Sequence, residues 1–173
     1  MESVILVNER DEEVGTMEKL QAHKEGKLHR AFSVLLFNSK GELLLQKRAS
    51  SKYHSGGLWT NTCCSHPQPG ETIIQAANRK LLQEMGIEVE LNESHKFIYK
   101  AQLDNHLTEH ECDHVIVGYF DGEPILNHHE AEDFKFLSIS EIQKDAKTNP
   151  DRYTCWFKLI LNQPELETLR VPA

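Results

Sequence analysis

The run of residues 59–87, WTNTCCSHPQPGETIIQAANRKLLQEMGI, constrains the fold more than any other part of the chain. Its first third alternates small polar residues with cysteines, and its last third predicts a helix over residues 72–85. Thr72 with Gln75 forms a capping-box pattern, and Gly86 suits the position after a helix end. The polar turn HPQPGE lies between them. A strand, a Gly/Pro loop and a charged helix in succession indicate metal and phosphate chemistry.

The loop and helix of this run resemble a Nudix box with altered residues. Glu71 is followed by seven residues and then by the sequence RKLLQEMGI, which begins at Arg79. Ser65 stands where the first glycine of the box is usual, and Lys80 and Gln83 stand at two usually acidic positions.

The segment TNTCCSHP, directly before the box, makes the resemblance more specific. A cysteine–histidine strand joined to such a box resembles the type I isopentenyl-diphosphate isomerases, which are Nudix-fold enzymes. The resemblance covers about residues 4–156. It implies an α+β fold, a single-domain Nudix-type α/β/α sandwich with a mixed sheet, and we expect one domain over residues 1–173.

Strand-forming residues recur outside the central run. Strands are expected at residues 4–8, 31–37, 42–47, 87–91, 96–103, 112–120 and 133–137. A helical turn is expected at 18–23, helices at 138–147 and 154–161, and polar connections at 11–15 and 104–110. The turn chemistry of Asn38–Gly41 predicts a hairpin between the second and third strands. The tail from Gln163 has no readable pattern, so the order of elements predicts a single α+β sandwich.

Composition limits the partners of the chain. A length of 173 residues is ordinary for one domain, and the formal charge of −8 argues against nucleic acid. The sequence has no apolar run of membrane-helix length and no signal-peptide pattern at its start. Four cysteines, two of them adjacent, make a poor disulfide framework and favour the reducing cytoplasm. We expect a monomer or homodimer that binds a small diphosphate.

The alternation of side chains along extended segments brings reactive groups together. Cys64 shares a face with His66, whereas Cys63 lies opposite, and Glu109 shares a face with Glu111. Three imidazoles and two carboxylates suit an octahedral metal site. The resemblance implies that this site consists of His23, His29, His66, Glu109 and Glu111, holding Mn²⁺, Mg²⁺ or Zn²⁺. Any one of these residues alone is more often a surface group, but five matching positions together favour the metal site.

The resemblance assigns Cys64 and Glu111 as the pair that handles protons. Moving a double bond along an allylic diphosphate adds a proton at one carbon and removes one two carbons away. Because the carbocation formed between these steps reacts with water, a dry pocket with aromatic faces is expected. Tyr99 and Trp156 match aromatic active-site positions of the family, although Tyr99 also suits a core residue.

The diphosphate needs cationic partners. By the resemblance these are Lys19, Arg48, Lys52 and Arg79, and Glu84 holds a Mg²⁺ ion that bridges the phosphate oxygens. Glu71, a usual carboxylate of the Nudix box, is expected to orient a neighbour instead.

Three other functions compete with the isomerase. His110 to His114 spells the HExxH pattern of zinc proteases, but the following VIVGYF favours a strand, and the protease motif needs a helix. A Nudix hydrolase acting on a nucleoside or other diphosphate is the main alternative, weakened by Lys80 and Gln83 at carboxylate positions. A catalytically silent module would be expected to have lost the ligand set.

Overall fold

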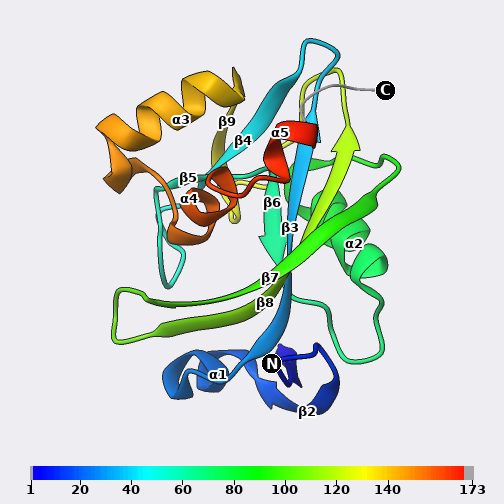
Figure 1. The fold of residues 1–173 in the computed structure, drawn as a ribbon, viewed down its shortest axis with the longest axis vertical. Coiled ribbons are helices and arrows are strands. Elements are labelled where there is room, and N and C mark those ends of the chain that lie inside the picture. The colour runs from blue at the N-terminus through cyan, green and yellow to red at the C-terminus, as the bar shows by residue number, and fades with distance from the viewer. Residues whose placement is uncertain (1, 170–173) are drawn as a thin grey trace.

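A computed structural model describes residues 2–169, which form one mixed sheet with helices on both faces (Figure 1). The strands among these residues are β1 (Ser3–Val7), β2 (Glu13–Glu18), β3 (His29–Phe37), β4 (Glu42–Arg48), β5 (Trp59–Thr60), β6 (Cys63–Ser65), β7 (Asn92–Gln102), β8 (Thr108–Tyr119) and β9 (Ala131–Ser138). The helices are α1 (Lys19–Glu25), α2 (Ile73–Met85), α3 (Ile139–Thr148), η1 (Pro150–Arg152), α4 (Cys155–Leu161) and α5 (Leu166–Leu169). The expected α/β/α sandwich with a mixed sheet is confirmed.

Strand β3 lies at the centre of the sheet. It pairs parallel with β8 and antiparallel with β1 and β6, while β4 pairs antiparallel with β5 and β9. Alternate side chains of β3 enter two separate cores. Leu35 and Phe37 pack in a core with α3 and α4, whereas Val34 and Leu36 pack in a core with α2. The central strand is therefore apolar on both faces.

Helix α2 begins and ends as its sequence predicts. Thr72 Oγ1 accepts a hydrogen bond from the Gln75 N–H at 3.1 Å, and Gln75 Oε1 accepts one from the Thr72 N–H at 3.0 Å. Gly86 ends the helix at φ +66°, and a Cβ built there would lie 2.9 Å from Cβ of Ile125. Since both caps are formed, the helix has a defined register against the sheet.

The expected hairpin is confirmed at its turn only. The Asn38 N–H donates to the Glu42 carbonyl at 2.9 Å, but β3 and β4 pair only at Phe37 and Leu43. The two strands then diverge toward different neighbours. Thr62 bridges them, since its Oγ1 donates to the Leu44 carbonyl at 2.6 Å and accepts from the Leu36 N–H at 3.0 Å. The buried Thr62 side chain thus supplies hydrogen bonds where β3 and β4 no longer pair with each other.

Several other expected boundaries are wrong. Residues 87–91 form no strand in the described part of the chain, although Ile87 and Leu91 are buried. Alternating burial shows which face meets the core, but it does not supply a neighbouring strand. The expected connection 104–110 is shorter, because β8 begins at Thr108 and includes Glu109. The expected turn 11–15 runs into strand β2, which has no fully buried residue and lacks an apolar pattern.

The remaining outcomes concern the ends of the chain. Helix α3 has the predicted cap, because Ser138 Oγ accepts a hydrogen bond from the Glu141 N–H. The tail includes α5, which no sequence pattern predicted. No helix within residues 2–169 combines the length and apolar character needed to cross a membrane. Residues 1 and 170–173 of the expected domain lie outside the described residues.

Candidate active site

A cavity of about 690 Å³, including its open mouth, lies where β6, β8, α2 and α4 approach the loop after β4. Most residues predicted from the sequence line this cavity: Lys19, Arg48, Lys52, Cys64, His66, Glu84, Glu109, Glu111 and Trp156. The cavity therefore brings together residues from most of the chain length.

A cluster of three histidines and two glutamates lies at one wall of the cavity, and we call it the His/Glu cluster. His23 Nε2 lies 2.9 Å from Glu109 Oε1, and His66 Nε2 lies 2.8 Å from Glu111 Oε2. His29 Nε2 lies between the two carboxylates, at 3.4 and 3.5 Å. One ligand atom from each of the five residues lies within 4.8 Å of all the others. The predicted ligand set is thus assembled around one point.

The sheet register explains this assembly. His29 opens β3 and stands directly beside Glu111 in the parallel pairing of β3 with β8. Glu109 lies two residues earlier on β8 and shares the same face. Helix α1 supplies His23, and the segment after β6 supplies His66. Four different segments therefore converge because the central strand pairs with both β6 and β8.

The polar environment of the His/Glu cluster fits a divalent cation. The Nδ1 atoms of His23 and His29 donate to the carbonyl oxygens of Lys19 and Lys27 at 2.7 and 2.8 Å. This leaves both Nε2 atoms facing inward, which is the orientation of metal-bound histidines. His23 Nε2 and Glu109 Oε1 are buried without a well-aligned hydrogen bond, although they lie close together. Divalent metals use such ligands, and this cluster could hold one.

The charges of the His/Glu cluster are strongly linked. Burial favours neutral His29, but the hydrogen-bonded carboxylates of Glu109 and Glu111 outweigh it and raise the pKa of His29 to about 10. Burial likewise favours neutral Glu111, yet hydrogen bonds from His29 and His66 hold the pKa of Glu111 well below its usual range. The cluster therefore attracts positive charge.

The two adjacent cysteines occupy opposite sides of β6, as predicted. Cys64 faces the cavity, whereas Cys63 is fully buried in the core beneath α2, with its Sγ 3.5 Å from Glu84 Oε1. Burial is the main cause that raises the pKa of Cys64 to about 12, against the opposing charge of Arg48. The Cys64 thiol therefore keeps its proton at neutral pH when no cation is bound.

The expected aromatic residues lie beside these groups. Tyr99 stands opposite Glu111 in the pairing of β7 with β8, and its hydroxyl donates to Glu111 Oε1 at 2.6 Å. Trp156 is 4% exposed and lines the cavity, with the Arg48 guanidinium 5.3 Å from the centre of its ring. Tyr99 thus fixes a carboxylate, and Trp156 forms part of the wall.

The predicted cation Arg79 lies outside the cavity. Its Nε and Nη2 atoms donate to the two oxygens of Glu71, both at 2.8 Å, so Glu71 orients a neighbour as expected. Lys80, the next residue, lines the cavity and lies 3.3 Å from Glu84. Arg79 instead lines a smaller neighbouring cavity together with Lys19, Ser65 and His66.

Sequence reasoning also missed His54, which lies in the loop between β4 and β5. Its ring is 6% exposed and meets Trp156 and Tyr53 edge to face, with centroids 5.9 and 4.7 Å apart. Burial, reinforced by Arg48, lowers the pKa of His54 to about 3, so this imidazole is neutral. No motif marks this position, because a loop histidine is usually solvated.

The HExxH pattern is not a protease site in this fold. His110 and His114 lie within strand β8, and His110 Nδ1 donates to the Gly26 carbonyl at 3.1 Å. The motif requires both histidines on one turn of a helix.

Comparisons with known proteins agree with this geometry. The family model for the NUDIX domain matches residues 27–157. A crystal structure of a Deinococcus radiodurans protein has a TM-score of 0.77 at 21% identity, covering 92% of this chain and 97% of the other. A MutT protein from Methanosarcina mazei has a TM-score of 0.67 at 17% identity, covering 82% and 94%. The fold and the cavity therefore define a Nudix-domain protein.

Sequence comparison with curated relatives identifies a particular family among the Nudix-domain proteins. An isopentenyl-diphosphate Delta-isomerase of Pectobacterium atrosepticum is 50% identical over 156 residues, which is 90% of this chain and 87% of that protein. Isopentenyl-diphosphate Delta-isomerase 1 of Aromatoleum aromaticum is 49% identical over 162 residues, which is 94% of this chain and 92% of that protein. The chain belongs to the family of isopentenyl-diphosphate Delta-isomerases.

Proposed function

We propose that this protein interconverts isopentenyl diphosphate and dimethylallyl diphosphate, as the names of its relatives indicate. The observation that carries the proposal is the meeting of Cys64 and Glu111 in one cavity that is also lined by cations. A proton is added at the terminal alkene carbon and another is removed two carbons away, so the substrate keeps its composition. One residue of the pair donates a proton and the other accepts one.

The proton-handling pair is supported by its neighbours. The Tyr99 hydroxyl holds Glu111 at 2.6 Å and fixes the direction of its second oxygen. Trp156 places an aromatic ring at the wall of the cavity, where a ring face stabilises a developing carbocation. The buried side chains around the cavity keep water from that cation. Tyr99 thus positions the acid–base group, and Trp156 protects the intermediate.

Four cations are available for the diphosphate: Lys19, Arg48, Lys52 and Lys80, all of which line the cavity. We propose Lys80 in the place first given to Arg79, because Arg79 is paired with Glu71 outside this cavity. Lys19 and Lys52 contact Glu2 and Glu130, both at 2.6 Å. A diphosphate would compete with these carboxylates for the two lysines.

Two divalent ions complete the proposed site. Glu84, 5% exposed at the cavity, would hold Mg²⁺ together with the diphosphate. The His/Glu cluster would hold the second ion, and its three imidazoles favour Mn²⁺ or Zn²⁺ over Mg²⁺. Bound there, the ion would offset the charge of the buried carboxylates. The inward Nε2 atoms and the poorly satisfied Glu109 oxygen support this assignment.

Hydrolysis of the diphosphate is the weaker proposal. Nudix hydrolysis relies on a group of carboxylates along the helix that activates water with metal ions. Helix α2 carries Lys80 and Gln83 on the turn before Glu84, and Gln83 is exposed. Lys80 also lies 3.3 Å from Glu84 and offsets its charge. This helix supports one cation at the phosphate rather than several.

The cell compartment and assembly are proposals of the same kind. Cys63, Cys64, Cys112 and Cys155 are all free thiols in the described part of the chain. Free thiols suit a reducing compartment, and we propose a cytoplasmic monomer or homodimer.

Incubation with isopentenyl diphosphate and Mg²⁺, followed by NMR, tests the proposed function directly. The expected result is a mixture of the two isomers without release of phosphate. Recovery of unchanged isopentenyl diphosphate, together with hydrolysis of common nucleoside diphosphates at enzymatic rates, would favour the hydrolase instead.

A further inference from the structure

Strand β8 carries a second group of potential ligands on the face opposite the His/Glu cluster. Because side chains alternate along a strand, Cys112 and His114 point away from the side of Glu109 and Glu111. Asp11, from the connection between β1 and β2, meets them there. One ligand atom each from Asp11, Cys112 and His114 lies within 4.8 Å of the other two. We call these three residues the outer cluster.

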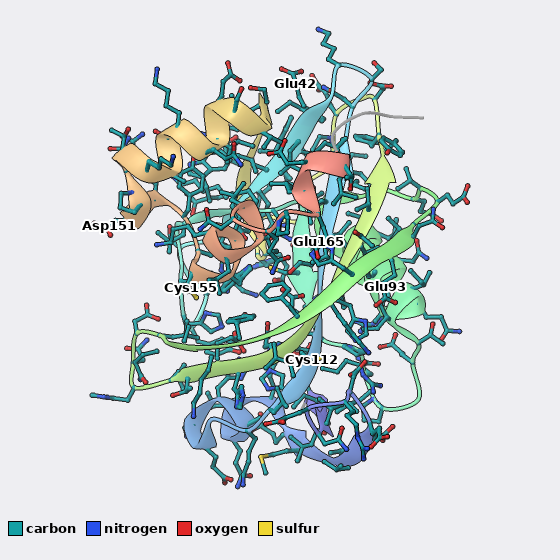
Figure 2. All side chains as sticks on the ribbon, in the orientation of Figure 1. Glu42, Glu93, Cys112, Asp151, Cys155 and Glu165 are labelled. Atoms are coloured by element: carbon teal, nitrogen blue, oxygen red, sulfur yellow. The ribbon has the colours of Figure 1, made fainter. Side chains whose placement is uncertain are left out.

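His114 has the orientation of a metal ligand. Its Nδ1 donates to Glu93 Oε1, and this contact turns Nε2 toward Asp11. His114 is 5% exposed, and its Nε2 has no well-aligned hydrogen bond although Asp11 Oδ2 lies 2.8 Å away. A carboxylate on one ring nitrogen commonly orients the other toward a metal. Figure 2 labels Glu93 and Cys112 on the β7–β8 ribbon.

Asp11 is held in place from its other side. Its Oδ1 accepts from Arg30 Nε at 2.8 Å, and its main-chain oxygen accepts from Arg30 Nη2 at 2.7 Å. Its φ of +63° is uncommon for a residue with a side chain, so these contacts hold a conformation that the chain alone disfavours. Asp11 Oδ2 is left facing His114. A ligating carboxylate is ordinarily held by such a second partner.

Cys112 supplies the third donor. It is 2% exposed and packs beside Ile5 and Val7, as an apolar filler would. Burial, with a smaller contribution from the Asp11 carboxylate, raises the pKa of Cys112 to about 12. The thiol is therefore protonated without a metal, and a metal that binds it must release one proton to solvent.

We propose that Asp11 Oδ2, Cys112 Sγ and His114 Nε2 bind one Zn²⁺ ion, with a solvent molecule as the fourth ligand. Zn²⁺ accepts sulfur, nitrogen and oxygen ligands in tetrahedral geometry. One thiolate and one carboxylate balance its charge. Lys96 Nζ, 3.3 Å from Asp11 Oδ2 on a side chain 49% exposed, turns into solvent when the ion binds. The ion would fasten the β1–β2 connection to β8.

The same residues can also form an ion-pair network without a metal, with His114 between Asp11 and Glu93. The two arrangements respond differently to added metal. Protein stripped of metal and titrated with Co²⁺ should develop thiolate-to-cobalt absorption in the near ultraviolet if Cys112 is a ligand. The titration uses Cys64→Ser as the background, since Cys64 lies near the His/Glu cluster.

The expected result is that Cys64→Ser keeps this absorption, whereas Cys64→Ser with Cys112→Ser loses it and binds one Zn²⁺ fewer per chain. Absorption that is absent from the background protein, or that survives the loss of Cys112, would overturn the proposal. Activity is not the readout, so a failure of the proposed isomerase reaction is distinguishable from a failure of this site.

Two surface variants keep the test decisive if Cys112→Ser does not fold. Glu93→Gln removes the carboxylate behind His114 and should weaken Co²⁺ binding at this site by roughly 10- to 100-fold. Lys96→Ala removes a competing cation and should leave Co²⁺ binding unchanged or tighter. Weaker binding in Lys96→Ala, or unaltered binding in Glu93→Gln, would count against the metal site and for the ion-pair network.

Discussion

Neighbouring residues on the same elements have opposite environments in this protein. On β6, Cys64 faces the cavity while Cys63 is fully buried beneath α2. On α2, Lys80 lines the cavity while Arg79 pairs with Glu71 outside it. On β8, the His/Glu cluster and the outer cluster lie on opposite faces. Residues of similar chemical type thus line the cavity on one side of these elements and pack or form ion pairs on the other side.

The two clusters of β8 differ in how their negative charge is balanced. Glu109 and Glu111 have only imidazoles as ion-pair partners in the described chain. The Asp11 carboxylate of the outer cluster contacts Arg30 and Lys96 as well as His114. Buried carboxylates that lack Arg or Lys partners depend more strongly on a bound ion to balance their negative charge. We therefore expect the His/Glu cluster to bind metal more tightly than the outer cluster.

The largest effect is expected at the proton-handling pair. Cys64→Ser replaces the thiol with a hydroxyl that barely ionises, so turnover should fall by about two orders of magnitude or more. Glu111→Gln should have a similar effect, because it loses both the charge and the base. Initial rates with isopentenyl diphosphate measure both.

Cys63→Ser is the matched control for this prediction. Cys63 is buried on the other side of β6, so its replacement should lower the melting temperature more than the rate. Equal loss of turnover at positions 63 and 64 in folded proteins would show that the assignment of roles is wrong.

This contrast also shows what sequence can predict. The opposite directions of Cys63 and Cys64 follow from a period of two, which is a local property of any strand. The helical spacing of Ile74, Ala77, Leu81 and Met85 likewise predicts a buried stripe on α2; the last three are fully buried and Ile74 is partly buried. Which of Arg79 and Lys80 lines the cavity was not predictable, because that depends on where the cavity lies around the helix.

The other failures have the same origin. His54 is buried because its loop folds against Trp156, a contact between residues about one hundred positions apart that no local pattern encodes. The segment 87–91 alternates like a strand, yet its pairing depends on whether a neighbouring strand is free. Local periodicity predicts which side chains share a face, whereas tertiary packing decides what that face meets.

The second prediction tests the His/Glu cluster against the outer cluster. His66→Ala removes one inward imidazole, so bound metal at this cluster and activity should fall together. Elemental analysis and initial rates on the same preparations provide the comparison. His110→Ala, on the other face of β8, is the control and should leave both unchanged. Full activity in His66→Ala would contradict the assignment of His66 as a ligand.

The third prediction compares the two cations of α2. Lys80→Ala should raise KM for isopentenyl diphosphate by roughly 10- to 100-fold, because a hydrogen bond to a charged group contributes about 1.5–3 kcal/mol. Arg79→Ala should have a smaller effect on KM, since Arg79 is bound to Glu71 outside the cavity. A larger rise in KM for Arg79→Ala than for Lys80→Ala would restore Arg79 as the phosphate contact.

The smallest effect is expected in the pH dependence of stability without metal. The pKa of His29 rises from 6.5 to about 10 on folding, because hydrogen bonds from its ring to Glu109 and Glu111 outweigh burial. The folded protein then holds a proton that the unfolded chain releases above pH 6.5, so this stabilisation is complete below that pH. This stabilisation should decline as pH rises toward 10.

Melting temperatures of chelator-treated protein should therefore fall between pH 6.5 and about 10, and His29→Gln should flatten this decline. Metal-loaded protein should also show a flatter profile, because a bound ion takes the place of the proton. An equal decline in metal-free wild-type protein and His29→Gln would show that another group causes it.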